Sequence, residues 1–125
     1  MDGLHLTADL RGCDPRQPAM TDPPALRALC LAAVRAAGLD AVGELFHRFA
    51  PPGGVTGVVL LAESHLAVHT WPEMDAVTLD VYVCNFGGDN SARAEALLAA
   101  LVEAFAPRRI ERHALRRGAV SEPAA

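Results

Sequence analysis

Short stretches in which apolar and polar residues alternate one by one constrain the fold of this chain most strongly. From Gly3 to Gly12 the apolar residues occupy every second position, with polar side chains between them. Successive side chains of a strand point to opposite faces, so this pattern predicts a strand that is buried on one face. Further strands are predicted at 40–49, 55–63, 65–71 and 76–84, and a last one at 108–117. The strongly apolar 55–63 is expected to lie centrally in the sheet.

Two other segments place apolar residues at helical spacing. The first has Thr21 or Asp22 as its cap, prolines in its first turn and Gly38 at its end. The second begins at Asn90 or Ser91 and ends before a proline, with this apolar stripe: Leu97, Leu98, Leu101, Val102, Phe105. The predicted order is β-α-β-β-β-β-α-β. We expect an α+β fold, a two-layer sandwich whose mainly antiparallel sheet carries both helices on one face. A second copy could cover the other face.

Length and composition limit the classes of protein to consider. With 125 residues, 51% of them hydrophobic, the chain fits one globular domain, expected at 1–117, with a disordered tail at 118–125. Three cysteines form no paired pattern, which predicts a reducing, cytoplasmic location. Neither a signal peptide nor a membrane-spanning run is apparent.

The charge distribution is uneven. The net charge is -4, yet five of the eleven arginines lie between residues 108 and 117. Because the overall balance is acidic, we expect no nucleic-acid partner, and interpret these arginines as a solvated edge strand or a dimer contact.

Chemically active side chains are concentrated between two of the predicted strands, in the stretch 63–73, which reads Glu-Ser-His-Leu-Ala-Val-His-Thr-Trp-Pro-Glu. One interpretation is a metal site formed by His65, His69 and Cys84. On a strand the two histidines would lie about 13 Å apart, which disfavours that site, and we expect no metal. Another is a nucleophile with a base, such as Ser64 with His69, but no Gly-x-Ser-x-Gly elbow surrounds the serine.

A third interpretation comes from a resemblance. Glu63-Ser64-His65, His69 to Glu73 and Cys84 together resemble the bacterial and archaeal S-adenosylmethionine decarboxylases, which are self-cleaving pyruvoyl enzymes. The similarity extends over about residues 3–117, including Phe46-His47-Arg48-Phe49 and the Gly54–Val59 run.

The resemblance implies that the chain makes its own cofactor. The Ser64 hydroxyl attacks the Glu63 carbonyl and forms an ester, and His69 removes the α-proton of Ser64. Elimination then yields a β chain, 1–63, and an α chain, 64–125, that begins with a pyruvoyl group derived from Ser64. Thr56 stands where the family carries a hydroxyl, usually serine, that assists this rearrangement.

The resemblance also implies the reaction. The pyruvoyl group forms a Schiff base with S-adenosylmethionine, carbon dioxide leaves, and Cys84 matches the family's proton donor to the α-carbon. The product is the aminopropyl donor for spermidine biosynthesis. Glu73 resembles the carboxylate that binds ribose, and Phe49 and Trp71 are candidates for stacking on adenine.

Several alternatives remain open at this stage. Pyruvoyl-dependent arginine or ornithine decarboxylases use a similar scaffold, and Asp75 or Asp89 could bind a guanidinium or ammonium group. A non-catalytic paralogue that assists an active decarboxylase is another alternative. The resemblance further implies a homodimer with sites between the subunits.

Overall fold

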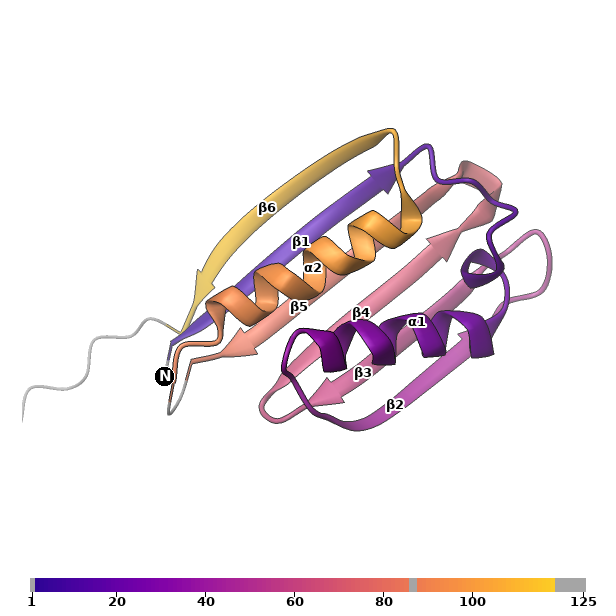
Figure 1. Ribbon diagram of the computed structural model, residues 1–125. Helices are drawn as coiled ribbons and strands as arrows, with labels where there is room; N and C mark the ends of the chain where they lie inside the picture. Colours follow the sequence, from indigo (N-terminus) through magenta and orange to yellow (C-terminus); the bar gives the residue numbers. More distant parts are fainter. Residues whose placement is uncertain (1, 86–87, 119–125) are drawn as a thin grey trace, which may run out of the picture.

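In the computed structural model, two helices cover one face of a six-stranded antiparallel sheet (Figure 1). The structure describes residues 2–85 and 88–118. The elements within these residues follow the predicted order β-α-β-β-β-β-α-β. Their bounds are β1 Gly3–Arg11, α1 Pro23–Ala36, β2 Ala41–Arg48, β3 Val55–Leu61, β4 Ser64–Trp71, β5 Ala76–Cys84, α2 Ser91–Phe105 and β6 Arg109–Arg117. Short 3-10 turns, η1 and η2, span Pro18–Met20 and Pro72–Met74. The predicted α+β sandwich is therefore confirmed.

The strands lie in the order β2-β3-β4-β5-β1-β6, and each neighbouring pair is antiparallel. The expectation that 55–63 lies centrally was wrong, because β3 is one strand in from an edge and β4 and β5 occupy the middle. The apolar character of β3 has another cause. Its alternate residues include Leu60, half exposed on the face that no helix covers.

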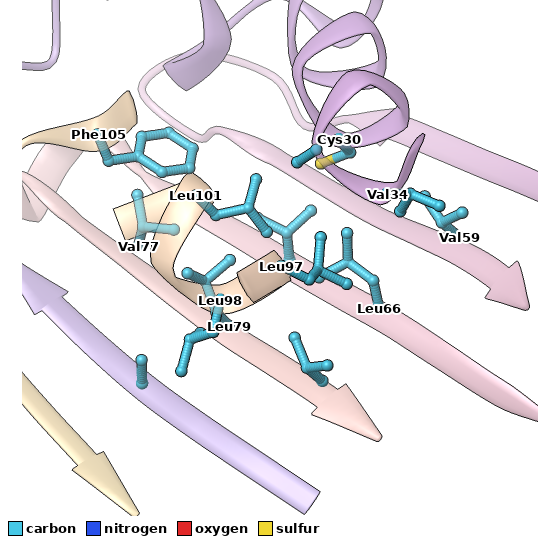
Figure 2. Close-up of a cluster of buried hydrophobic side chains, with 14 of the residues drawn as sticks. Cys30, Val34, Val59, Leu66, Val77, Leu79, Leu97, Leu98, Leu101 and Phe105 are labelled. Atoms are coloured by element: carbon cyan, nitrogen blue, oxygen red, sulfur yellow. The ribbon is translucent and has the colours of Figure 1, made fainter. Parts of the chain in front are cut away.

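The core lies between the helices and the sheet (Figure 2). As predicted, the α2 stripe is buried there, apart from Val102 at its margin, and so are the inward residues of β5: Val77, Leu79, Val81, Val83. Cys30 of α1 also packs in this core, and burial raises the pKa of its thiol to about 12. All three cysteines are free.

The first helix begins as predicted, with Asp22 at the N-cap position and prolines in the first turn. The Asp22 side chain accepts no capping hydrogen bond, so only its position matches the expectation. Beyond the helix, Gly38 adopts φ 79°, a left-handed conformation that glycine tolerates. Within the described residues, no helix has the length and apolar character needed to cross a membrane.

No helix of the described residues covers the second face of the sheet, and we call it the open face. The register between the strands places all five histidines on it: His5, His47, His65, His69, His113. At the far edge, every residue of the arginine-rich β6 is exposed in the single chain. The predicted edge position is confirmed, and a dimer contact there stays a prediction. The expected tail lies outside the described residues except for Gly118, and so do Phe86 and Gly87 of the loop before α2.

Candidate active site

Ser64 is the first residue of β4 and follows a tight turn. Leu61 and Ser64 pair across the β3–β4 hairpin, so Ala62 and Glu63 alone make the turn. Glu63 has φ 52°, in the left-handed region. This conformation costs a residue with a side chain about 1–2 kcal/mol, because Cβ approaches the backbone too closely. The peptide bond between residues 63 and 64 therefore follows a strained residue.

Cys84 lies beside Ser64 at this end of the sheet. It is the last residue of β5, and its backbone N–H donates a hydrogen bond of 3.1 Å to Ser64 Oγ. The Cys84 side chain is nearly buried. The structure thus brings together two of the three predicted catalytic residues, and we call this pair the serine end.

A cavity of about 370 Å³ lies at the opposite end of β4, and we call it the histidine cavity. Five predicted site residues line it: Phe49, Thr56, His69, Trp71, Glu73. Two aromatic rings give it a largely apolar wall, and Glu73 supplies its carboxylate. An apolar cavity with a few convergent polar groups is the usual form of a small-molecule site.

His69 is held in this cavity by Thr56. The two residues pair across β3 and β4, and Thr56 Oγ1 lies 3.0 Å from His69 Nδ1. When His69 Nδ1 carries the proton and donates to Thr56, Nε2 is unprotonated and can accept a proton from a substrate. The geometry therefore gives Thr56 a role in orienting the ring of a candidate base, because its hydroxyl can pair with Nδ1 in either tautomer.

Three further lining residues were not predicted from the sequence: Gly53, Gly54, Thr70. The buried Thr70 hydroxyl donates to the Met20 carbonyl at 2.7 Å and accepts from the Val55 N–H at 2.8 Å. A Cβ on Gly54 would overlap the Thr70 backbone and side chain. One sequence signal could have revealed the hydrogen bonds of Thr70. It is a polar residue at a position of β4 that faces the core, like the leucine and the valine at the preceding core-facing positions of the strand.

The serine end and the histidine cavity are far apart within one protomer. Ser64 and His69 are separated by five residues of one strand, which is about 16 Å at the usual rise of about 3.3 Å per residue. An odd separation also puts their side chains on opposite faces. His69 therefore cannot reach Ser64 of its own chain.

The metal interpretation required His65 and His69 to converge. Both lie on strand β4, and the His65 ring stacks on Tyr82 with centroids 5.7 Å apart. Across residues 2–85 and 88–118, no three His, Cys, Asp or Glu side chains are close enough to hold a metal ion.

The aspartates considered for an arginine-type substrate lie outside the histidine cavity. Asp75 lines a separate hollow with Cys13. The pKa of the Cys13 thiol is raised, mainly by burial and to a smaller extent by the negative charge of Asp75. The Asp89 carboxylate accepts a hydrogen bond from the Ser91 N–H at 2.9 Å, which lowers the pKa of Asp89. Within one protomer, neither carboxylate lines the histidine cavity.

Comparison with known proteins assigns this chain and its fold to one class of enzyme. The sequence model of the S-adenosylmethionine decarboxylase family matches residues 4–118. The S-adenosylmethionine decarboxylase proenzyme of Aquifex aeolicus (strain VF5) is 40% identical over 120 residues, covering 96% of this chain and 84% of the relative. The proenzyme of Sulfurihydrogenibium sp. (strain YO3AOP1) is 37% identical over 118 residues, covering 94% and 84%.

A solved structure agrees with this result. The crystal structure of the adenosylmethionine decarboxylase from Aquifex aeolicus VF5 superposes with a TM-score of 0.86 at 36% identity, covering 98% of this chain and 96% of that one. The chain belongs to the S-adenosylmethionine decarboxylase family, whose members are carboxy-lyases. The family predicted from the sequence is therefore confirmed.

Proposed function

We propose that this chain is a proenzyme that cleaves itself between Glu63 and Ser64 and then decarboxylates S-adenosylmethionine. The observation that carries the proposal is the serine end. There, the Ser64 hydroxyl is held by the Cys84 N–H directly after the left-handed Glu63, in a chain of this family. Backbone strain at Glu63, directly before the attacked peptide bond, and a fixed nucleophile both favour an intramolecular reaction.

The self-cleavage needs only the chain and one water molecule. Ser64 Oγ attacks the Glu63 carbonyl carbon, and the C–N bond is exchanged for an ester. A base removes the Ser64 α-proton, and the Cβ–O bond breaks to release Glu63 as a carboxylate. The dehydroalanine at position 64 then takes up water and loses ammonia, which leaves a pyruvoyl group at the start of the α chain.

The site fits such a group. Residue 64 lies in the β3–β4 hairpin and its neighbours pair with β3 and β5, so a chain cut before it stays in the sheet. When formed, the pyruvoyl group supplies an electron-withdrawing ketone for loss of carbon dioxide from an amino acid. Cys84 is the candidate for returning a proton, since its amide contacts residue 64 and its side chain carries a thiol.

The histidine cavity suits the nucleoside part of the proposed substrate. Phe49 and Trp71 can stack on adenine and attract the sulfonium charge, and Glu73 can accept hydrogen bonds from both ribose hydroxyls.

The separation of the two clusters supports a homodimer in which each complete site spans two subunits. A two-fold axis across the strands, with the open faces together, brings the histidine cavity of one protomer to the serine end of its partner. The partner's His69 then acts on the α-hydrogen of Ser64, which points away from the side chain at the tetrahedral α-carbon. Exposed leucines at 45, 60 and 115 on that face favour such a contact.

The test is release of labelled carbon dioxide from carboxyl-labelled S-adenosylmethionine, arginine and ornithine. We expect release from S-adenosylmethionine alone. Release only from arginine or ornithine would contradict the substrate, and a cleaved chain that is inactive on all three would contradict the activity. A chain that acts only by stimulating a second decarboxylase would indicate the paralogue alternative.

A further inference from the structure

Two residues that do not line the histidine cavity contact the two aromatic rings that do. His47 of β2 meets Phe49 edge to face, with ring centroids 4.8 Å apart and planes at 79°. Thr78 of β5 accepts a hydrogen bond of 3.3 Å from the Trp71 indole N–H. Neither residue was assigned a role by the sequence.

The sheet register explains why these contacts fall beside the cavity. His47 pairs with Thr56, Thr56 pairs with His69, and His69 pairs with Thr78. The four side chains therefore form one row across β2, β3, β4 and β5 on the open face. The candidate base and its hydroxyl partner occupy the middle of this row, and His47 and Thr78 occupy its two ends.

Both aromatic rings lack support from the core. Phe49 is 50% exposed and Trp71 is 39% exposed, so core packing does not fix their orientation. The Phe49 backbone is held, because its N–H donates to the Gly54 carbonyl at 2.9 Å, but this bond leaves the ring free to rotate. An edge-to-face contact and an indole hydrogen bond each restrict one ring.

We propose that His47 and Thr78 are positioning residues that hold Phe49 and Trp71 in the orientation in which they stack on the substrate's base. The inference rests on the proposed function, because the ligand is the nucleoside part of S-adenosylmethionine. Orienting the rings before binding removes an ordering cost from association. The effect therefore appears in substrate binding and leaves the chemical step unchanged.

The experiment compares Thr78→Val and His47→Ala with the wild-type enzyme. Each variant should raise KM for S-adenosylmethionine by about three- to tenfold, the scale of one aromatic contact or weak hydrogen bond, and leave kcat and self-cleavage within about twofold. Thr78→Ser restores the hydroxyl and His47→Phe restores the ring, so both should return KM to near the wild-type value. Thr7→Val and His113→Ala change the same residue types elsewhere on the open face and serve as controls.

A second readout does not depend on decarboxylation. Trp71 is the only tryptophan of the chain, so intrinsic fluorescence reports its environment directly. Thr78→Val should increase quenching of this fluorescence by acrylamide, and Thr7→Val should leave it unchanged. An unchanged KM in both variants, or a fall in kcat at constant KM, overturns the inference. If the wild type shows no decarboxylation, the proposed function fails, and the quenching result still decides whether Thr78 orients the indole.

Discussion

At the scale of single residues, His69 has a fixed hydrogen-bond partner, but it cannot reach the α-proton of Ser64 in its own chain. Thr56 holds Nδ1 at 3.0 Å, whereas Ser64 lies at the other end of β4. The proposed role of His69 is to remove the α-proton after the ester has formed. Loss of the imidazole should therefore stop self-cleavage at the ester and not before it.

His69→Ala should give a chain that remains joined by an ester between residues 63 and 64. Neutral hydroxylamine should split this ester into two fragments of about half size on an SDS gel. The chain contains no Asn-Gly bond that hydroxylamine would attack. Ser64→Ala is the matched control, since it cannot form the ester and should stay whole. A His69→Ala chain that cleaves fully without hydroxylamine would show that another group is the base.

The sequence named most of the residues that line the cavity, but it missed Gly53, Gly54 and Thr70, and it did not predict which candidates lie together. The stretch 63–73 and Cys84 carried the family resemblance, and Phe49, Thr56, His69, Trp71 and Glu73 do line one cavity. Residues 64 and 69 are close in the sequence, but they lie about 16 Å apart, because β4 is an extended strand. The contacts of His47 and Thr78 depend on the register between strands, which alternation within one strand does not determine.

At the scale of elements, the β3–β4 turn is where local structure and chemistry meet. Glu63 adopts φ 52°, and glycine would adopt the same conformation without the steric cost.

Glu63→Gly should relax the turn and slow self-cleavage, by about fivefold for each 1 kcal/mol of strain removed. Glu63→Ala is the control, because it removes the carboxylate and keeps the Cβ that causes the strain. The rate is read from the time course of precursor loss after synthesis in a cell-free system. Equal rates for the glycine and alanine variants would show that strain in this turn does not contribute.

The packing of α2 on the sheet should dominate the stability of the fold. Phe105 is fully buried at the end of the helix, so Phe105→Ala should lower the free energy of unfolding by about 3–5 kcal/mol. Urea unfolding must be measured in the Ser64→Ala background, where the chain remains in one piece. Val42→Ala, at a side chain 69% exposed on β2, should change stability by less than about 0.5 kcal/mol. A small effect of Phe105→Ala would mean that α2 contributes little to the core.

Periodicity predicted the type of each element, because burial on one face leaves a local pattern in the sequence. It did not predict the strand order, in which β1 lies between β5 and β6. Nor did it place β3 next to the edge strand, since an apolar residue facing a partner subunit or solvent looks like a core residue in the sequence. These two features depend on contacts between distant segments.

At the scale of the whole molecule, the uncovered open face and the separation of Ser64 from His69 both lead us to expect a homodimer whose sites span the two subunits. If each site takes Ser64 from one subunit and His69 from the other, two inactive chains can complement each other. In a mixed dimer of Ser64→Ala and His69→Ala chains, one site combines both substitutions and the other combines both wild-type residues.

Co-expression of differently tagged Ser64→Ala and His69→Ala chains should therefore yield cleaved fragments of the His69→Ala chain only. Fragments are identified by their tag on a denaturing gel, without hydroxylamine. Each chain expressed alone is the control. If the His69→Ala chain stays whole in the mixture, the site does not span the two subunits.

The central claim is that the chain is cut before residue 64 and that the new end carries a ketone. Intact-mass spectrometry of freshly purified wild-type protein tests this most directly. The account predicts two chains, 1–63 and 64–125, the second lighter by one ammonia than the same segment beginning with serine. A single mass for the joined chain, or a second segment that retains its amino group, would contradict it.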